Sequence, residues 1–213
     1  MDVILSLFVW PLVTLWHYLR FILSIITCLP YLLYSLARMK SPLADFQKMH
    51  ASLKCFPLGI YLFSGLVGMY SPYQASVYPV VEDLTDDGLC VISMKDYPWV
   101  RNPFSCVHAA ALTNLGEACG GIAAFSAFQK NKHLKGIPVK LTTTFIAKAR
   151  GKITGKARVD LSSINSECER ELITNLYNSK NELVCTVAVT WRISVKSPKT
   201  GSGGGSKLPH KRE

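Results

Sequence analysis

A long and almost uncharged segment in the second half of the chain constrains the fold more than any other feature of the sequence. Residues 102–128, NPFSCVHAAALTNLGEACGGIAAFSAF, are rich in Ala, Leu, Gly and Ile, and a helix of this composition has to be covered on most of its sides. Its only acid is Glu117. Because burying an unpaired carboxylate is costly, Glu117 is the first candidate for a functional residue.

Segments typical of β-strands lie on both sides of this helix. Two short ones, 75–81 and 89–94, are joined by Asp86, Asp87 and Gly88, a sequence that favours a hairpin turn. In the last strand-like segment apolar and polar residues alternate, as in a strand with one buried face. This order predicts an α+β fold in which a curved antiparallel sheet wraps a long central helix. The four segments that follow the helix are 139–150, 152–161, 171–177 and 182–195.

The chain begins with two apolar runs of seventeen residues, 3–19 and 21–37, separated by Arg20. One helix over both runs would be roughly 50 Å long, which exceeds the ~30 Å hydrocarbon core of a bilayer. We therefore expect a membrane-anchor helix with an interfacial continuation that bends at Pro30. A cleaved signal peptide is the alternative, but the segment is long and begins with Asp2 rather than with basic residues.

Charge and cysteine content place the domain relative to this anchor. The cations nearest the anchor, Arg38, Lys40, Lys48 and Lys54, all follow it, so the positive-inside rule predicts a domain facing the cytosol from the endoplasmic reticulum or another organelle membrane. The seven cysteines form no CxxC pair, and neither a metal site nor a disulfide framework is expected. The net charge of +10 suits lipid headgroups or a phosphate-bearing ligand; no nucleic-acid-binding motif accompanies it.

Composition divides the chain into four parts. We expect a membrane anchor at 1–40, a helical connector at 41–73, a folded domain at 74–196 and a disordered basic tail at 197–213. Within the connector, the apolar and Gly-rich run 56–70 is short for a membrane span. It is either a helix packed against the domain or a helix half sunk in the membrane surface.

Three residues around the central helix follow a recognisable spacing. His108 lies six residues after Asn102, and Glu117 lies nine residues after His108. With these residues the chain resembles the hotdog-fold acyl-CoA thioesterases, in the branch similar to the bacterial phenylacetate-pathway thioesterase. The resemblance covers about residues 74–195. It extends to FIAKARGKITGKARVD at 145–160, which looks like the branch's central strands, and to NSKNELVCTVAVTWRIS at 178–194, which looks like its closing hairpin.

The resemblance implies thioester hydrolysis. Glu117 would act as general base on a water molecule, and the backbone N–H groups of Ala109 and Ala110 would stabilise the oxyanion. Asn102 would hold the turn or the water, and His108 would orient the thioester carbonyl. The implied substrate is acyl-CoA, with coenzyme A bound as part of it and no separate cofactor.

Helix geometry adds a constraint of its own. Nine positions at 100° per residue put Glu117 about half a turn from His108, so a site that uses both residues needs two helices. Hotdog proteins, by resemblance, meet this need as homodimers. We expect a homodimer here, with a tetramer of two such dimers as the alternative. Thr113, Asn114 and Gly121 share a face with Glu117, and Asn114 or Thr113 is a candidate for positioning the water.

The sequence departs from the branch at two points. Ala109 and Ala110 replace its Gly-Gly pair, which keeps the N–H donors but narrows the backbone's freedom. Glu117 replaces the commoner Asp. Either change is compatible with a different substrate or with lost catalysis. Three cations between the later strands are candidates for binding coenzyme A phosphates, or else form a solvated edge: Lys148, Arg150 and Lys152.

Several of these residues have simpler roles open to them. His108 is also suited to capping the helix, and Glu117 to pairing with a cation across a dimer. Cys106 and Cys119 are candidate nucleophiles, although small buried thiols are commoner. The leading hypothesis is a membrane-anchored hotdog homodimer that hydrolyses fatty acyl-CoA. The alternatives are a non-catalytic acyl-CoA or lipid binding protein and a membrane scaffold.

Overall fold

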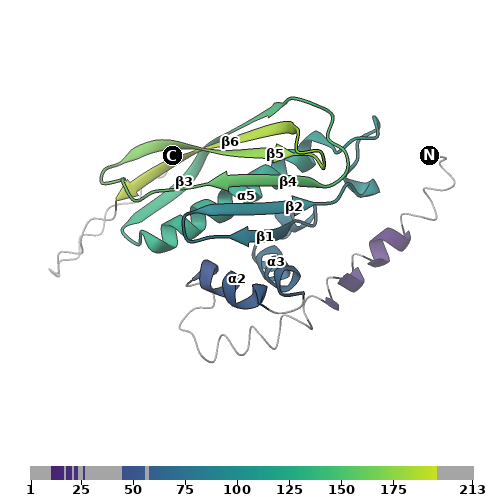
Figure 1. Ribbon diagram of the computed structural model, residues 1–213, viewed down its shortest axis with the longest axis horizontal. Helices are drawn as coiled ribbons and strands as arrows, with labels where there is room; N and C mark the ends of the chain where they lie inside the picture. Colours follow the sequence, from purple (N-terminus) through teal and green to yellow (C-terminus); the bar gives the residue numbers. More distant parts are fainter. Residues whose placement is uncertain are drawn as a thin grey trace, which may run out of the picture.

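A computed structural model describes residues 11–16, 18–20, 22–23, 26, 45–55 and 58–195. Six antiparallel strands form one sheet, and the long helix α5 runs along one face of it (Figure 1). The expected α+β fold is therefore confirmed. The strands are β1 (Val80–Leu84), β2 (Leu89–Met94), β3 (Leu134–Phe145), β4 (Ile153–Arg158), β5 (Cys168–Tyr177) and β6 (Leu183–Val195).

The strand order places β3 at an edge of the sheet. The order is β1-β2-β4-β5-β6-β3, so β3 and β4, which follow one another in sequence, are separated by β5 and β6. The hairpin turn expected at Asp86–Gly88 joins β1 to β2, with Gly88 at φ +84°. Asn178 turns β5 into β6, because its side-chain oxygen accepts hydrogen bonds from the backbone N–H groups of Lys180 and Glu182.

The central helix α5 (Ala109–Lys130) is shorter than the segment that predicted it. The expectation that it includes 102–108 is wrong. Pro103 disfavours a helical conformation in the residue before it, and Ser105 has a positive φ of 55°. The helix begins after His108, whose side chain accepts a hydrogen bond from the backbone N–H of Ala110.

The strand expected at 75–81 is also misplaced. Residues Pro72–Ala75 form the short helix α4, and β1 begins only at Val80. Pro72 favours a first helical position because it lacks an N–H. Tyr78, at φ 52°, then turns the chain into the strand. The strand propensity of Val77 and Tyr78 is outweighed here by the two prolines at 72 and 79.

The third strand runs earlier than the predicted 139–150. It begins at Leu134 and continues past Pro138, where the pairing with β6 shifts register. A proline is tolerated at such an irregularity in an edge strand. Residues 146–150 are not part of the strand, and β4 is shorter than the predicted 152–161.

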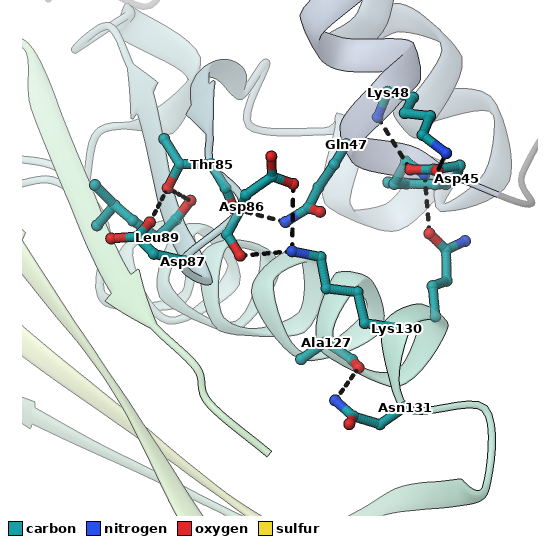
Figure 2. A network of polar contacts seen from close by, with 12 residues as sticks. Asp45, Gln47, Lys48, Thr85, Asp86, Asp87, Leu89, Ala127, Lys130 and Asn131 are labelled. Carbon is teal, nitrogen blue, oxygen red and sulfur yellow. Dashed lines mark hydrogen bonds and ion pairs between the residues drawn. The ribbon is translucent and has the colours of Figure 1, made fainter. Parts of the chain in front are cut away.

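Two helices pack beside β1 at the opposite edge (Figure 1): α2 (Phe46–Lys54) and α3 (Gly59–Tyr70). Figure 2 shows polar contacts that join α2, the β1–β2 turn and the end of α5. Gln47 Nε2 donates to the Thr85 carbonyl at 2.5 Å, and Lys130 Nζ to the Asp86 carbonyl at 2.5 Å. The connector helix is thus fixed to the sheet and to α5.

Helix α3 packs against the domain along one face only. Phe63 and Leu66 are buried, whereas Tyr61 and Tyr70 are more than half exposed. Of the two readings of 56–70, packing against the domain is confirmed for this inner face, and contact of the outer face with a membrane stays a prediction. Within the described ranges, no helix has the length and apolar content needed to cross a bilayer. Most of the expected anchor and the 197–213 tail lie outside the described residues.

Stability is expected to depend on pH through His50 of α2. Its ring is 1% exposed against Phe63, and burial lowers its pKa, while a backbone hydrogen bond with Val81 acts in the opposite direction. Since the unfolded chain binds the proton at about pH 6.5, stability is full above that pH and falls as the pH drops towards the lowered pKa of the folded state. Urea midpoints at pH 7.5 and 5.5 measure this.

The control for this prediction is a matched pair of variants. His50→Gln should reduce the pH dependence of the urea midpoint, whereas His133→Gln, at an exposed position, should preserve it. An unchanged pH dependence in His50→Gln would show that another group controls the acid sensitivity.

Candidate functional site

One stripe of α5 is less buried than the rest of the helix. Thr113, Glu117, Gly121 and Phe125 follow one another at intervals of four residues and are half-buried or, for Phe125, 45% exposed. Most of the other residues of the helix are buried. We call these four residues the open stripe. The prediction of a helix covered on most sides holds, and the acid lies on the side that is left open.

Glu117 has a partner that the sequence did not predict. Gln74 Nε2, from α4, donates a hydrogen bond to Glu117 Oε2 at 2.5 Å. The other oxygen lies beside Gly121, since a Cβ added there would be 3.6 Å from Oε1. Gln74 fell in the segment expected to lead into a strand. One feature of the sequence could have drawn attention to Gln74 as a functional residue: it is the only carboxamide in the uncharged stretch 55–81.

The Asn114 side chain forms hydrogen bonds to the segment around Gln74, and its suggested role in positioning a water molecule stays a prediction. Asn114 is 8% exposed, and its Nδ2 donates to the Tyr73 carbonyl at 3.1 Å and to Ser76 Oγ at 3.3 Å. These two residues flank Gln74. Asn114 therefore fastens α4 to α5, which is a structural role at the edge of the site.

The loop before α5 holds the other two residues of the spaced set. Asn102 Oδ1 accepts hydrogen bonds from the backbone N–H of Phe104 at 2.9 Å and of Cys106 at 3.4 Å, so Asn102 shapes the turn. His108 Nδ1 accepts from the Ala110 N–H at 3.0 Å. His108 thus caps the helix, and it engages one of the two N–H groups suggested for an oxyanion.

The structure keeps His108 and Glu117 apart within one chain. At about 1.5 Å per residue, nine positions separate them by roughly 13 Å along the helix axis. Thr113 is closer to the acid, one turn before it, and its hydroxyl lies 3.1 Å from that of Thr143 on β3. A site that combines His108 and Glu117 therefore still requires a second copy of the helix.

The three candidate cations differ in their surroundings. The loop that carries Lys148 and Arg150 packs beside the start of α5, where Arg150 Nε donates to the Ser105 carbonyl at 3.2 Å. Lys152 lies elsewhere and is paired with Glu82 at 2.5 Å. It lines a depression of about 300 Å³ on the sheet face opposite α5, together with Thr154, Lys156, Tyr177, Asn178, Ser179 and Asn181. Of the three cations, only Lys148 and Arg150 therefore lie on a loop that borders the N-terminus of α5.

The candidate cysteine nucleophiles are enclosed. Cys119 is 0% exposed and its Sγ donates to the Cys90 carbonyl at 3.5 Å, while Cys106 is 7% exposed beside Asn102. Their surroundings are those of buried structural thiols. Within the described part of the chain, His, Cys, Asp and Glu side chains form no group of three that could hold a metal ion.

A central helix wrapped by a curved six-stranded antiparallel sheet, with an acid on the helix, defines the hotdog class. Solved structures of that fold match this chain at low identity. A Pseudomonas aeruginosa protein described as a probable thioesterase is 21% identical, with a TM-score of 0.56 over 66% of this chain and 97% of its own. A thioesterase from Haemophilus influenzae is 15% identical, with a TM-score of 0.51 over 70% of this chain and 98% of its own.

The chain belongs to the family described as domain of unknown function DUF4442, whose model matches residues 59–193. This range includes α3 and α4 as well as the sheet and α5. A thioesterase family protein from Silicibacter pomeroyi is also similar, at 15% identity and a TM-score of 0.51 over 62% of this chain and 96% of its own. No curated protein matches the sequence. The structural likenesses confirm the hotdog fold expected from the resemblance.

Proposed function

We propose that this chain hydrolyses acyl-CoA thioesters, with fatty acyl groups as the preferred substrates and Glu117 as the general base. The observation that carries the proposal is the placement of Glu117. It is the only acid of α5, and it is half-buried on the open stripe with Oε2 held by Gln74 and Oε1 beside the bare backbone of Gly121. A half-buried carboxylate held through one oxygen has its second oxygen left to act as the base.

The proposed reaction uses the chain's own groups in sequence. Glu117 takes a proton from water as the water oxygen attacks the thioester carbon, which gives a tetrahedral intermediate. The intermediate then breaks its C–S bond to release the carboxylic acid, and the proton on Glu117 passes to the departing coenzyme A thiolate. Backbone N–H groups at the start of a partner's α5, at Ala109 and Ala110, receive the developing negative charge, assisted by the helix dipole. For Ala110 to take part, His108 has to turn away from its cap, which also frees the imidazole to contact the carbonyl. Lys148 and Arg150, on the loop beside the start of the helix, would bind the phosphates of coenzyme A.

The dimer is proposed to form along β3. This twelve-residue strand has one unpaired edge and carries exposed apolar side chains, among them Leu141 at 49% and Phe145 at 51% exposure. A long apolar edge is a template for pairing with another strand. Leu141 shares its sheet face with Thr143, which contacts α5. Pairing around a twofold axis would therefore extend the sheet and bring the two helices together.

Leu141→Lys is expected to convert the dimer into monomers and to remove activity with it, because a charge on the pairing edge opposes strand association. Sedimentation velocity in detergent at micromolar protein measures the mass. Ile173→Lys is the matched control, since Ile173 on β5 is also 49% exposed but lies away from that edge. A dimer that survives Leu141→Lys, or that is lost equally in the control, contradicts β3 pairing.

One observation favours a second candidate function, the binding of acyl-CoA without turnover. The Ala110 N–H is already engaged by His108, which leaves an oxyanion with one donor fewer. The test is a chain-length series of acyl-CoA hydrolysis by the full-length protein in detergent, with acyl-CoA binding followed by calorimetry on the same samples. Hydrolysis above background supports the enzyme. Binding without hydrolysis at every chain length supports a non-catalytic acyl-CoA binding protein. Either hydrolysis or binding would contradict a membrane scaffold that takes no ligand.

Anchoring belongs to the same proposal. The apolar runs at 3–19 and 21–37 would hold the domain at the cytosolic face of an organelle membrane, close to lipid-derived acyl groups. Alkaline carbonate extraction and protease protection of the full chain in microsomes test the attachment and the orientation. Release of the protein by carbonate, or protection of the domain from added protease, would contradict it.

A further inference from the structure

The geometry points to Gln74 as a positioning residue that holds Glu117 Oε2 so that Oε1 alone is presented to the reacting water. This inference rests on the proposed function and adds a residue to its site. The bond from Gln74 Nε2 to Oε2 is 2.5 Å long, and it joins two elements that are 43 residues apart in sequence. No spacing or motif around Glu117 indicates it.

Helix α5 itself places the donor. Asn114, three residues before Glu117, donates to the Tyr73 carbonyl at 3.1 Å and to Ser76 Oγ at 3.3 Å. These contacts lie on either side of Gln74 in the chain. Helix α5 thus carries both Glu117 and Asn114, the side chain that fixes the segment around Gln74. This holds the Gln74 carboxamide at a fixed position relative to the Glu117 carboxylate.

The two carboxylate oxygens have different surroundings as a result. Oε2 is occupied by Gln74, whereas Oε1 lies near Gly121, which has no side chain and is half-buried. A Cβ at Gly121 would meet Oε1 at 3.6 Å, so the glycine leaves the space next to this oxygen open. A carboxylate fixed through one oxygen has its other lone pairs in a defined direction, which is what proton abstraction requires.

The chemical nature of the donor fits this role. A Lys or Arg at position 74 would form an ion pair, which stabilises the charged form of a carboxylate and makes it a weaker base. A neutral carboxamide orients the group without that charge. Residues 55–81 carry no Asp, Glu, Lys, Arg or His at all, so α3 and α4 bring no competing charge to the site.

The test is Gln74→Leu in the full-length protein with acyl-CoA as substrate. We expect kcat to fall by about ten- to a hundredfold while KM stays within about twofold, because the lost bond orients the base and not the substrate. In the Glu117→Gln background the same substitution should cause no further fall, since its effect acts through Glu117. Gln47→Leu is the matched control, because Gln47 donates an equally short bond, to the Thr85 carbonyl, away from the site. It should leave kcat unchanged.

Crystal structures of the wild type and of Gln74→Leu give a readout that does not depend on turnover. The expected result is that Glu117 keeps one orientation in the wild type and adopts another, or several, in the variant. An unchanged Glu117 in Gln74→Leu overturns the inference, as does a further loss of activity on the Glu117→Gln background or an equal loss in Gln47→Leu. If the wild type hydrolyses no thioester, the proposed function fails, and the crystal structures still decide whether Gln74 positions Glu117.

Discussion

Glu117→Gln is expected to lower acyl-CoA turnover by about 10²- to 10⁴-fold, the range attributed to a general base. The substitution is nearly isosteric, and its amide oxygen can still accept the hydrogen bond from Gln74, so α4 should stay in place. Acyl-CoA binding and the urea midpoint are therefore expected to change little. Steady-state hydrolysis, calorimetry and urea unfolding on the same protein measure the three quantities.

The control for this prediction is Glu171→Gln, which removes an exposed carboxylate from β5 and should leave hydrolysis intact. Turnover within about threefold of the wild type in Glu117→Gln would exclude a general base, whose removal costs far more. A variant that loses stability and activity together would instead assign Glu117 and Gln74 a structural role. That outcome corresponds to the simpler reading of Glu117 as a paired acid.

Gly116→Ala is expected to destabilise the domain by about 2 kcal/mol, within the range for overpacked cores. A Cβ at Gly116 would lie 2.4 Å from Cγ2 and 2.6 Å from Cβ of Val187 on β6. Val187 is fully buried, and a β-branched side chain has little freedom to turn away. The helix and the sheet therefore have to separate. Urea unfolding of the purified variants measures the free energy of unfolding.

Gly121→Ala is the matched substitution on the same helix. Its added Cβ would meet only Glu117 Oε1, at 3.6 Å, which is ordinary contact. The higher helix propensity of Ala should then stabilise the domain by up to about 1 kcal/mol. Hydrolysis is expected to decrease in Gly121→Ala, since the methyl group occupies space beside the base. Equal destabilisation by both substitutions would contradict the close contact between Gly116 and the sheet.

The elements of the fold could be predicted where the pattern is long and repetitive. The uncharged stretch around Glu117 indicated the central helix, and the alternation at Val187, Val189 and Ile193 indicated a strand whose buried face the structure confirms. Errors occurred where single residues override propensity, as with Pro72, which begins a helical turn that continues into the first residue of the strand expected at 75–81. The conformational preference of such a residue is local, but whether it outweighs the strand propensity of its neighbours depends on how they pack.

The candidate site was only partly accessible from the sequence. The lone acid of the helix could be identified because burial of a carboxylate is costly wherever the helix lies. The bond between His108 and the Ala110 N–H shows that His108 caps the helix, while its suggested role towards the thioester carbonyl stays a prediction. The bonds of Asn114 to Tyr73 and Ser76 could not be foreseen, because the helix α4 that lies between these two residues was not expected.

The sequence by itself determined that this chain forms an apolar helix with one acid and an antiparallel sheet that covers it. Helix and strand periodicities are local, and an apolar helix has to be covered. Only the tertiary structure decided which oxygen of Glu117 is held, which glycine contacts the sheet and which strand edge is left unpaired. These depend on contacts between residues tens of positions apart, such as Gln74 with Glu117 and Gly116 with Val187. Such contacts are set by how the elements pack together, and no local pattern in the chain encodes them.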